Sequence, residues 1–351
     1  MEVTVIIGVR PHYVKANALN SILKNTSIIP KFLDIHQHYD PQMRDVFVSE
    51  ENLPVICMST PQKHSNNPID EMSRQMNDIY KWLNSVEGKK SKAVIVFGDA
   101  NPAFVASIVA NRMNMPIIHI EAGVRRIKLE KEHWNSLITD HLSKLRYCYT
   151  SQNVSDLQRE GLSEGTYLVG DIFANWTIRK AQKAVGPIIN EPYVLVSIHR
   201  PQNCTNLYIS NICASLSSLK IKIIWILHPR MREFSRIIEN YINIQILHSQ
   251  SHSNALALIK NADFILTDSG GFVREGVLLG KKVIVCHEQG MWVDLVNSGA
   301  ILRTDNDLDS IKKSINYTIS NEFPSGKEHF IFPKGEKIFL ETMNDFLISC
   351  P

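Results

Sequence analysis

Short apolar runs rich in β-branched residues alternate with longer amphipathic stretches along the whole chain, and this alternation constrains the fold most. Runs that are apolar throughout predict strands buried on both faces, which is typical of parallel sheets covered by helices. Because two sets of such runs follow one another, we predict two doubly wound α/β domains. The predicted strands are residues 3–8, 29–35, 93–97, 116–120 and 146–150, then 193–198, 222–227, 242–247, 263–267 and 282–286.

The length of 351 residues also suits two domains. The clearest Gly/Pro break in the middle of the chain is Gly186-Pro187. We therefore predict an N-terminal domain over residues 1–186 and a C-terminal domain over residues 187–351. A final helix, residues 335–349, is expected to be able to pack back on the N-terminal domain.

Composition excludes several classes of partner. The net charge is only +3 and the basic residues are scattered, which argues against nucleic acid and against a membrane surface. No apolar run is long enough to cross a bilayer, and the N-terminus lacks the basic segment of a signal peptide. Six widely separated cysteines without CxxC spacing predict mostly reduced, buried thiols. These features predict a cytoplasmic protein.

Ligands of doubly wound sheets bind beyond the carboxyl ends of the strands, so residues just after the predicted strands are the candidate site residues. After the first strand, Pro11 suits the first turn of a helix, and Arg10 and Lys15 would complete an anion site there. The alternative is a plain turn with two solvated bases. After the strand 93–97 comes Asp99, which could instead be the N-cap of the next helix.

Two further acids follow the next strand. Glu121 comes directly after the strand 116–120, and Glu132 lies in the first turn of a helix that ends near His141. Glu132 could serve only the helix dipole, and His119, on the strand itself, is interpreted as a core residue. Because Asp99, Glu121 and Glu132 lie beside successive strand ends, they could converge. Several carboxylates in one site suit proton abstraction from carbon.

The second half carries basic and glycine-rich strand ends. His199 and Arg200 follow the strand 193–198 and suit a pyrophosphate oxygen or proton transfer, unless they simply face water. Ser269, Gly270 and Gly271 open a helix, where backbone amides can bind a phosphate. Glu275 could accept the hydroxyls of a ribose, although the whole segment could also be an ordinary strand–helix turn. No zinc-type spacing occurs, and no metal is predicted.

Taken in order, several of these segments resemble the non-hydrolysing UDP-N-acetylglucosamine 2-epimerase family. The matching segments are GVRPHYVK (8–15), QHYD (37–40), GDA (98–100), HIEAGVR (119–125), ITDH (138–141), VGD (169–171), HRPQN (199–203) and LTDSGGFVRE (266–275). The resemblance implies a fold of the GT-B type, with two Rossmann-like domains and the active site in the cleft between them. It also implies a mechanism in which UDP leaves C1 of the sugar as the proton on C2 is removed. UDP and a proton are then added back, so no cofactor is needed.

The resemblance implies roles for individual residues. Asp99, Glu121 and Glu132 match the acid–base carboxylates of the family, and His199 matches its catalytic histidine, which lies near the phosphates. The matches to its UDP contacts are Arg10, Lys15, His199, Arg200, Ser269, Gly270, Gly271 and Glu275. A family-like homodimer is a further expectation.

The chain departs from the family pattern at a few segments. Lys131–Ser136 lacks a usual second acid and an arginine, and Ile35-His36 replaces a usual Thr-Gly pair. The segment 292–294, Trp-Val-Asp, looks more like the branch that acts on UDP-2,3-diacetamido uronic acids.

We therefore expect a UDP-sugar 2-epimerase of a surface-polysaccharide pathway. Its substrates would be UDP-GlcNAc and UDP-ManNAc, or a pair of UDP-2,3-diacetamido uronic acids. The alternatives are a GT-B glycosyltransferase that uses a UDP-sugar donor, or a UDP-sugar-binding relative without catalysis.

Overall fold

The computed structural model describes residues 1–36, 48–49, 52–58, 67–125, 130–248, 250–286 and 292–350. The chain forms two compact units, one of Met1–Trp176 with Phe330–Pro351 and the other of Thr177–His329. The division falls inside helix α7 (Ala174–Lys183), whose Trp176 is buried in the core of the first unit. The Gly186-Pro187 break, expected from the sequence as the joint, therefore lies within the second unit, and the C-terminal segment belongs to the first.

The first unit is built on a parallel sheet. Among the described residues its seven strands are β1 (Glu2–Ile7), β2 (Ile29–Asp34), β3 (Val55–Cys57), β4 (Ser91–Phe97), β5 (Ile117–Ala122), β6 (Leu145–Cys148) and β7 (Thr166–Leu168). They lie in the order β3-β2-β1-β4-β5-β6-β7, and every pairing is parallel. The helices are α1 (Arg10–Leu23), α3 (Pro68–Leu83), α4 (Asn101–Arg112), α5 (Lys131–Leu142), α6 (Ser151–Arg159) and α14 (Gly335–Ser349).

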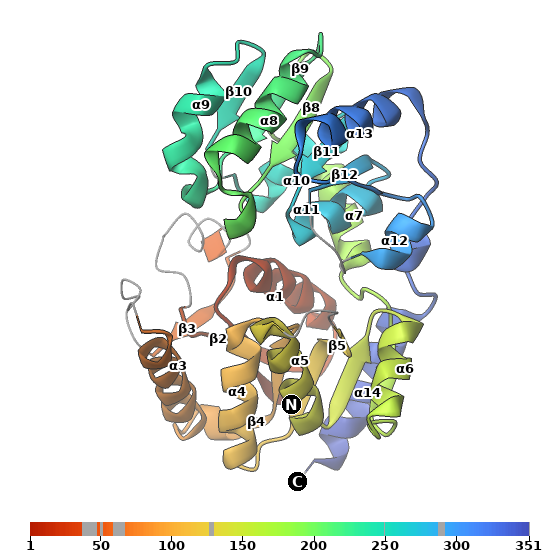
Figure 1. The fold of residues 1–351 in the computed structure, drawn as a ribbon. Helices are drawn as coiled ribbons and strands as arrows, with labels where there is room; N and C mark the ends of the chain where they lie inside the picture. The colour runs from red at the N-terminus through yellow and green to blue at the C-terminus, as the bar shows by residue number, and fades with distance from the viewer. Residues whose placement is uncertain are drawn as a thin grey trace. The chain divides into compact units, whose positions relative to one another are not determined.

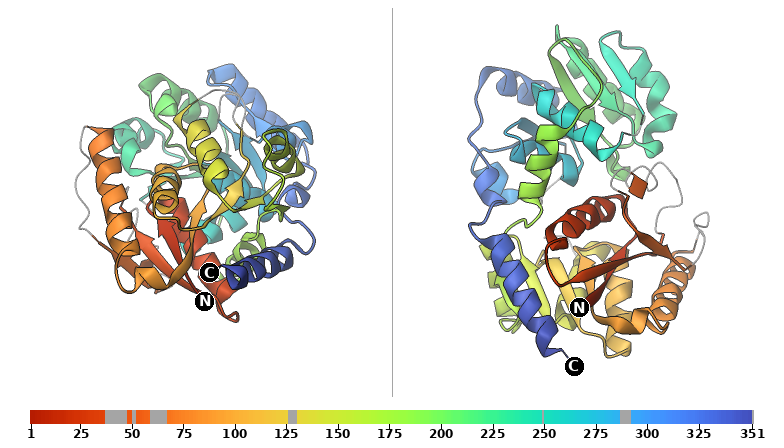
Figure 2. Two further views of the ribbon diagram at one scale, coloured as in Figure 1. Left: turned by 90° about the horizontal axis from the view of Figure 1, so that it is seen from below. Right: turned by 180° about the vertical axis from the view of Figure 1, so that it is seen from behind.

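Helices cover both faces of this sheet (Figure 1). Side chains of β1 alternate between two apolar clusters, Val3 and Val5 in one and Ile6 in the other, because successive residues of a strand point to opposite faces. Tyr13 of α1 and Phe339 of α14 pack into the first cluster. The final helix thus completes the core of the first unit, and Figure 2 shows it lying along that unit.

The second unit repeats the architecture. Its strands are β8 (Tyr193–Ser197), β9 (Lys222–Ile226), β10 (Ile244–Leu247), β11 (Phe264–Thr267), β12 (Lys282–Val285) and β13 (Leu302–Arg303), in the order β10-β9-β8-β11-β12-β13. All are parallel. The helices are α8 (Asn206–Ser217), α9 (Ser235–Glu239), α10 (His252–Asn261), α11 (Gly270–Leu278), α12 (Val293–Asn297) and α13 (Leu308–Ser320). Fully buried Trp225 lies in its apolar core.

The predicted strands agree with the observed ones to within a few residues at each end, and the prediction of two parallel α/β sheets is confirmed. Within the described part of the chain, no helix combines the length and apolar character needed to cross a membrane.

Candidate active site

The strand order of each sheet reverses once, between β1 and β4 in the first unit and between β8 and β11 in the second. Such a reversal is where doubly wound sheets bind ligands, since the connections on its two sides leave toward opposite faces. The residues that follow these four strands begin at Gly8, Gly98, Ile198 and Asp268. Most of the sequence-predicted site residues therefore lie beside the two reversal points.

The turn after β1 leads directly into α1. The helix begins at Arg10 with a proline in its first turn, and the side chain of its N-cap residue, Val9, makes no capping hydrogen bond. Arg10 is half-buried at this helix start. One turn later, Lys15 forms an ion pair with Glu121 of β5. The N-terminus of α1 thus combines a helix dipole with two cations, which suits a phosphate.

Glu121 is held in one position by its backbone and by two side chains. Its backbone has a φ of 70°, a left-handed conformation that few residues other than glycine adopt. Its Oε1 accepts a hydrogen bond of 2.6 Å from the hydroxyl of Tyr149 as well as the ion pair from Lys15. A Cβ atom placed on Gly98 would come within 3.1 Å of Glu121 Oε2. Lys15, Gly98, Glu121 and Tyr149 therefore form one polar group at the carboxyl edge of the sheet.

Asp99 follows β4 and lies next to this group in the chain. The N-cap of α4 is Ala100, so the alternative that Asp99 caps this helix is wrong. The carbonyl oxygen of Asp99 accepts a hydrogen bond of 3.0 Å from Asn135 of α5, which also donates to Asn101. Asn135 belongs to the same first turns of α5 as Glu132, which is half-buried. The segment 131–136, which departs from the family pattern, is thus hydrogen-bonded to the loop that contains Asp99.

A buried chain of charges supports the end of β5. His119 Nδ1 lies 2.7 Å from Asp140, and its Nε2 lies 2.8 Å from the carbonyl oxygen of Gly98. Both partners are acceptors, so an imidazole that carries a proton on each nitrogen would satisfy both bonds. Arg125 donates to Asp140 at 2.7 Å and to Glu160 at 2.6 Å. His119 is a fully buried structural residue, in line with its interpretation as a core residue.

The ionisation of Asp140 follows from this environment. Burial alone would raise its pKa, but the positive charges and hydrogen bonds of His119 and Arg125 hold the pKa of Asp140 below its usual value. The backbone amide of Gly123, just past β5, also donates to this carboxylate at 3.1 Å. Asp140 therefore fixes the strand end from which Glu121 projects, a role that the sequence did not assign.

In the second unit, Asp268 organises the strand ends. Its carboxylate accepts hydrogen bonds from the backbone amides of His199, at 3.0 Å, and Arg200, at 2.9 Å, and from the side chain of Asn203. The His199 ring lies 3.2 Å from the same carboxylate and stacks on His228. Burial raises the pKa of Asp268, although the hydrogen bonds from Arg200, Asn203 and His199 oppose that shift. Asp268 was not among the predicted site residues, and it holds His199 and Arg200 in place.

The glycine-rich segment after β11 opens α11 as predicted. Ser269 is the N-cap of this helix and accepts a hydrogen bond from the amide of Phe272. Among the residues that the structure describes, a Cβ atom on Gly271 would meet only the Ser269 hydroxyl, at 3.8 Å, so a ligand can approach this backbone closely. Farther along α11, buried Glu275 lies 2.8 Å from Nε2 of His252, the first residue of α10. That partner of Glu275 was not foreseen from the sequence.

Part of the predicted constellation lies outside the described residues. The segment Gln37–Asp40 and the residues 287–291 are not among those described. The structure places Arg10, Lys15, Asp99, Glu121 and Glu132 in the first unit, and groups Lys15 with Glu121. It places His199, Arg200, Ser269, Gly270, Gly271 and Glu275 in the second unit.

Comparison with known proteins agrees with the resemblance seen in the sequence. The family model of UDP-N-acetylglucosamine 2-epimerase matches residues 21–336. A UDP-2,3-diacetamido-2,3-dideoxy-D-glucuronate 2-epimerase of Pseudomonas aeruginosa is 25% identical, covering 92% of this chain and 94% of its own. A UDP-N-acetylglucosamine 2-epimerase of Methanococcus maripaludis is 29% identical, and the match covers 93% of this chain and 95% of the relative.

Solved structures show the same architecture. The crystal structure of Methanocaldococcus jannaschii UDP-GlcNAc 2-epimerase, in complex with UDP-GlcNAc and UDP, matches with a TM-score of 0.84 and 23% identity, over 98% of this chain and 100% of that one. This likeness confirms the expected fold of the GT-B type. The family model matches nearly the whole length of the chain, and this chain therefore belongs to the UDP-N-acetylglucosamine 2-epimerase family.

Proposed function

We propose that this protein interconverts a UDP-2-acetamido sugar and its C2 epimer by eliminating and re-adding UDP. The observation that carries the proposal is the group of Lys15, Gly98, Glu121 and Tyr149 at the sheet reversal of a chain that belongs to this family. A carboxylate held between a cation and a phenol hydroxyl can exchange a proton at a fixed position. That is what proton transfer at C2 requires.

The proposed reaction balances without an external oxidant or reductant. A carboxylate among Asp99, Glu121 and Glu132 takes the C2 proton, and the electron pair of the C2–H bond forms a C1–C2 double bond. The C1–O bond breaks, and its electron pair leaves with UDP. A carboxylic acid then returns a proton to the opposite face of C2 while UDP re-adds to C1.

The leaving UDP gathers negative charge as the C1–O bond breaks. Arg10 and Lys15 supply positive charge at the start of α1, and the amides of Gly270 and Gly271 supply donors at the start of α11. Donors that are fixed before the reaction stabilise such charge well, because they need no rearrangement. His199 and Arg200, held by Asp268, are proposed as further phosphate contacts.

The sugar is proposed as UDP-GlcNAc first and a UDP-2,3-diacetamido uronic acid second. The second candidate is supported by the name of the Pseudomonas aeruginosa relative and by the Trp-Val-Asp segment at 292–294. We also propose a cytoplasmic homodimer in a surface-polysaccharide pathway, which the resemblance supports.

Isotope exchange tests the proposed reaction directly. Incubation with UDP-GlcNAc in D2O is expected to place deuterium at C2 and to yield the manno epimer, both followed by NMR. The same assay with the UDP-2,3-diacetamido uronic acid decides between the two sugars. Transfer to an added acceptor without C2 exchange would identify a glycosyltransferase. UDP-sugar binding without exchange for either sugar would identify a non-catalytic relative and end the epimerase proposal.

Glu275→Gln tests the proposed contact with ribose. A hydrogen bond to a charged group contributes about 1.5–3 kcal/mol, so UDP binding should weaken by about 10- to 100-fold in calorimetry. Glutamine preserves the shape of the side chain next to His252, which protects the fold. The matched control is Glu191→Gln, an exposed glutamate of the same unit paired with Lys222 at 2.8 Å. Unchanged UDP affinity in Glu275→Gln would remove this residue from the nucleotide site.

A further inference from the structure

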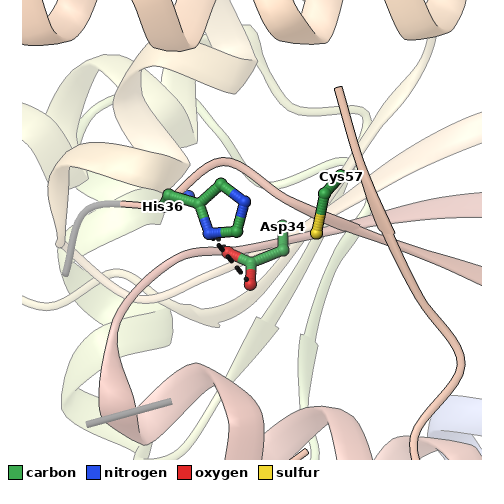
Figure 3. A group of neighbouring side chains, drawn as sticks. All are labelled: Asp34, His36 and Cys57. Atoms are coloured by element: carbon green, nitrogen blue, oxygen red, sulfur yellow. Dashed lines mark hydrogen bonds and ion pairs between the residues drawn. The ribbon is translucent and has the colours of Figure 1, made fainter. Parts of the chain in front are cut away.

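Three potential metal ligands meet at one edge of the first sheet. Asp34 ends β2 and Cys57 ends β3, and the two residues are register partners in the parallel pairing of these strands. His36 follows two residues after Asp34. One ligand atom from each side chain, an oxygen, a nitrogen and a sulfur, lies within 4.8 Å of the other two. Figure 3 shows the His36 ring directed at the Asp34 carboxylate, with the Cys57 sulfur beside it.

Asp34 is held firmly in one orientation. The hydroxyl of Tyr13 donates to both of its oxygens, at 3.0 and 3.1 Å, and the backbone amide of His36 donates to Oδ1 at 3.0 Å. The side chain is fully buried, which fixes its orientation.

His36 is placed beside Asp34 by its backbone. Its φ of 50° lies in the left-handed region, which strains a residue with a side chain. Arg74 of α3 donates to the carbonyl oxygens of His36, at 2.9 Å, and of Ile35, which holds this turn in place. The His36 side chain is only 2% exposed, and its Nδ1 lies 3.4 Å from Asp34 Oδ2.

The spacing and the ligand types fit one transition-metal ion. Two ligands about 2.0–2.1 Å from a tetrahedral zinc ion stand about 3.4 Å apart, and Nδ1 of His36 and Oδ2 of Asp34 are at that separation. Imidazole, carboxylate and thiolate are all zinc ligands, and thiolate disfavours magnesium and calcium. Cys57 is exposed, so its side chain can rotate toward the ion, which can enter from the same side.

We propose that Asp34, His36 and Cys57 bind one zinc ion, separately from the group of Lys15, Gly98, Glu121 and Tyr149. The thiol of Cys57 loses its proton to solvent when it binds, and the three side chains leave one position of a tetrahedral ion for a further ligand or water. The proposal does not depend on the epimerase reaction.

The test uses the full chain, stripped of metal by a chelator and kept reduced, with Zn²⁺ or Co²⁺ as the probe. Equilibrium dialysis is expected to find one tight zinc ion per chain. Bound Co²⁺ should show the intense visible bands of tetrahedral cobalt and a thiolate-to-cobalt charge-transfer band in the near ultraviolet. Zinc should also raise the melting temperature, since it binds only the folded ligand set.

Single substitutions assign the ligands. Cys57→Ser should abolish the charge-transfer band, and Cys57→Ser and His36→Gln should each weaken zinc binding by about 100-fold or more, since even residues behind a metal ligand cost 10- to 100-fold. Cys350→Ser and His329→Gln are the matched controls and should leave both signals unchanged. Because Cys57 is exposed, its serine variant should fold normally, as circular dichroism checks.

Two results would overturn the proposal. One is dialysis that finds no zinc bound beyond the amount on the Cys57→Ser variant. The other is bound cobalt without a thiolate band, which would show that Cys57 is not a ligand.

Discussion

Glutamine in place of Glu121 is expected to slow C2 exchange by about 100- to 10,000-fold, the usual contribution of a positioned acid–base group. The substitution keeps the shape of the side chain, and the amide oxygen can still accept the hydrogen bond from Tyr149. What disappears is the negative charge beside Lys15 and the ability to take up a proton. UDP binding should persist, because Arg10 and the start of α11 do not depend on this carboxylate.

The measurement is the rate of deuterium incorporation at C2, with UDP affinity determined separately by calorimetry. The matched control is Glu87→Gln, which also removes a glutamate from a Glu–Lys pair, here an exposed one with Lys90 at 2.7 Å. It should exchange at the rate of the unmodified protein. If Glu121→Gln also exchanges at that rate, the proton is carried by Asp99 or Glu132.

Asp140→Asn is expected to lower the free energy of unfolding by about 3–5 kcal/mol, the usual cost of removing one partner from a buried ion pair. His119 and Arg125 both direct positive charge at this carboxylate, and the amide of Gly123 donates to it as well. Asparagine retains the size but not the charge. Urea denaturation followed by circular dichroism measures the loss. Asp309→Asn, an exposed acid on α13, is the control and should change stability by less than about 0.5 kcal/mol.

The Asp140 effect should depend on pH in one direction. Its pKa is lower in the folded protein than the value of about 3.9 in an unfolded chain. The stabilisation is therefore fully present above about pH 4 and is lost as the pH falls through the native pKa. The difference in the free energy of unfolding between the unmodified protein and Asp140→Asn should be large at neutral pH and should shrink in acid. A difference that stays constant into acid would mean that the charge of Asp140 does not stabilise the fold.

The central strands could be predicted because they are apolar on both faces, and such runs are recognisable without tertiary information. The strands missed were β3, β7 and β13, which are only two or three residues long. A strand this short has no measurable period, and pairing with a neighbour that is distant in sequence decides its structure. The joint between the domains was expected at Gly186-Pro187, but the chain passes from the first unit to the second inside helix α7. A continuous helix shows no Gly/Pro break that would mark the joint in the sequence.

The polar residues at the strand ends could be found from the sequence, whereas the residues that hold them in place could not. Glu121 and His199 could be singled out because polar residues after buried strands are unusual. Asp140 and Asp268 act through partners many residues away, 21 positions in the case of Asp140 and His119, and no spacing rule covers such pairs. The meeting of Asp34 with Cys57 has the same origin, because the register of two parallel strands produces it.

The first unit contains residues from both ends of the chain, while the second is one continuous stretch. During synthesis on a ribosome, the complete second unit emerges before the first unit has received Phe339, Met343 and Leu347, which fill part of its apolar core. The usual order, in which the N-terminal domain of a protein matures first, is therefore reversed. Until these three residues have emerged, the nascent first unit exposes the apolar surface that they cover.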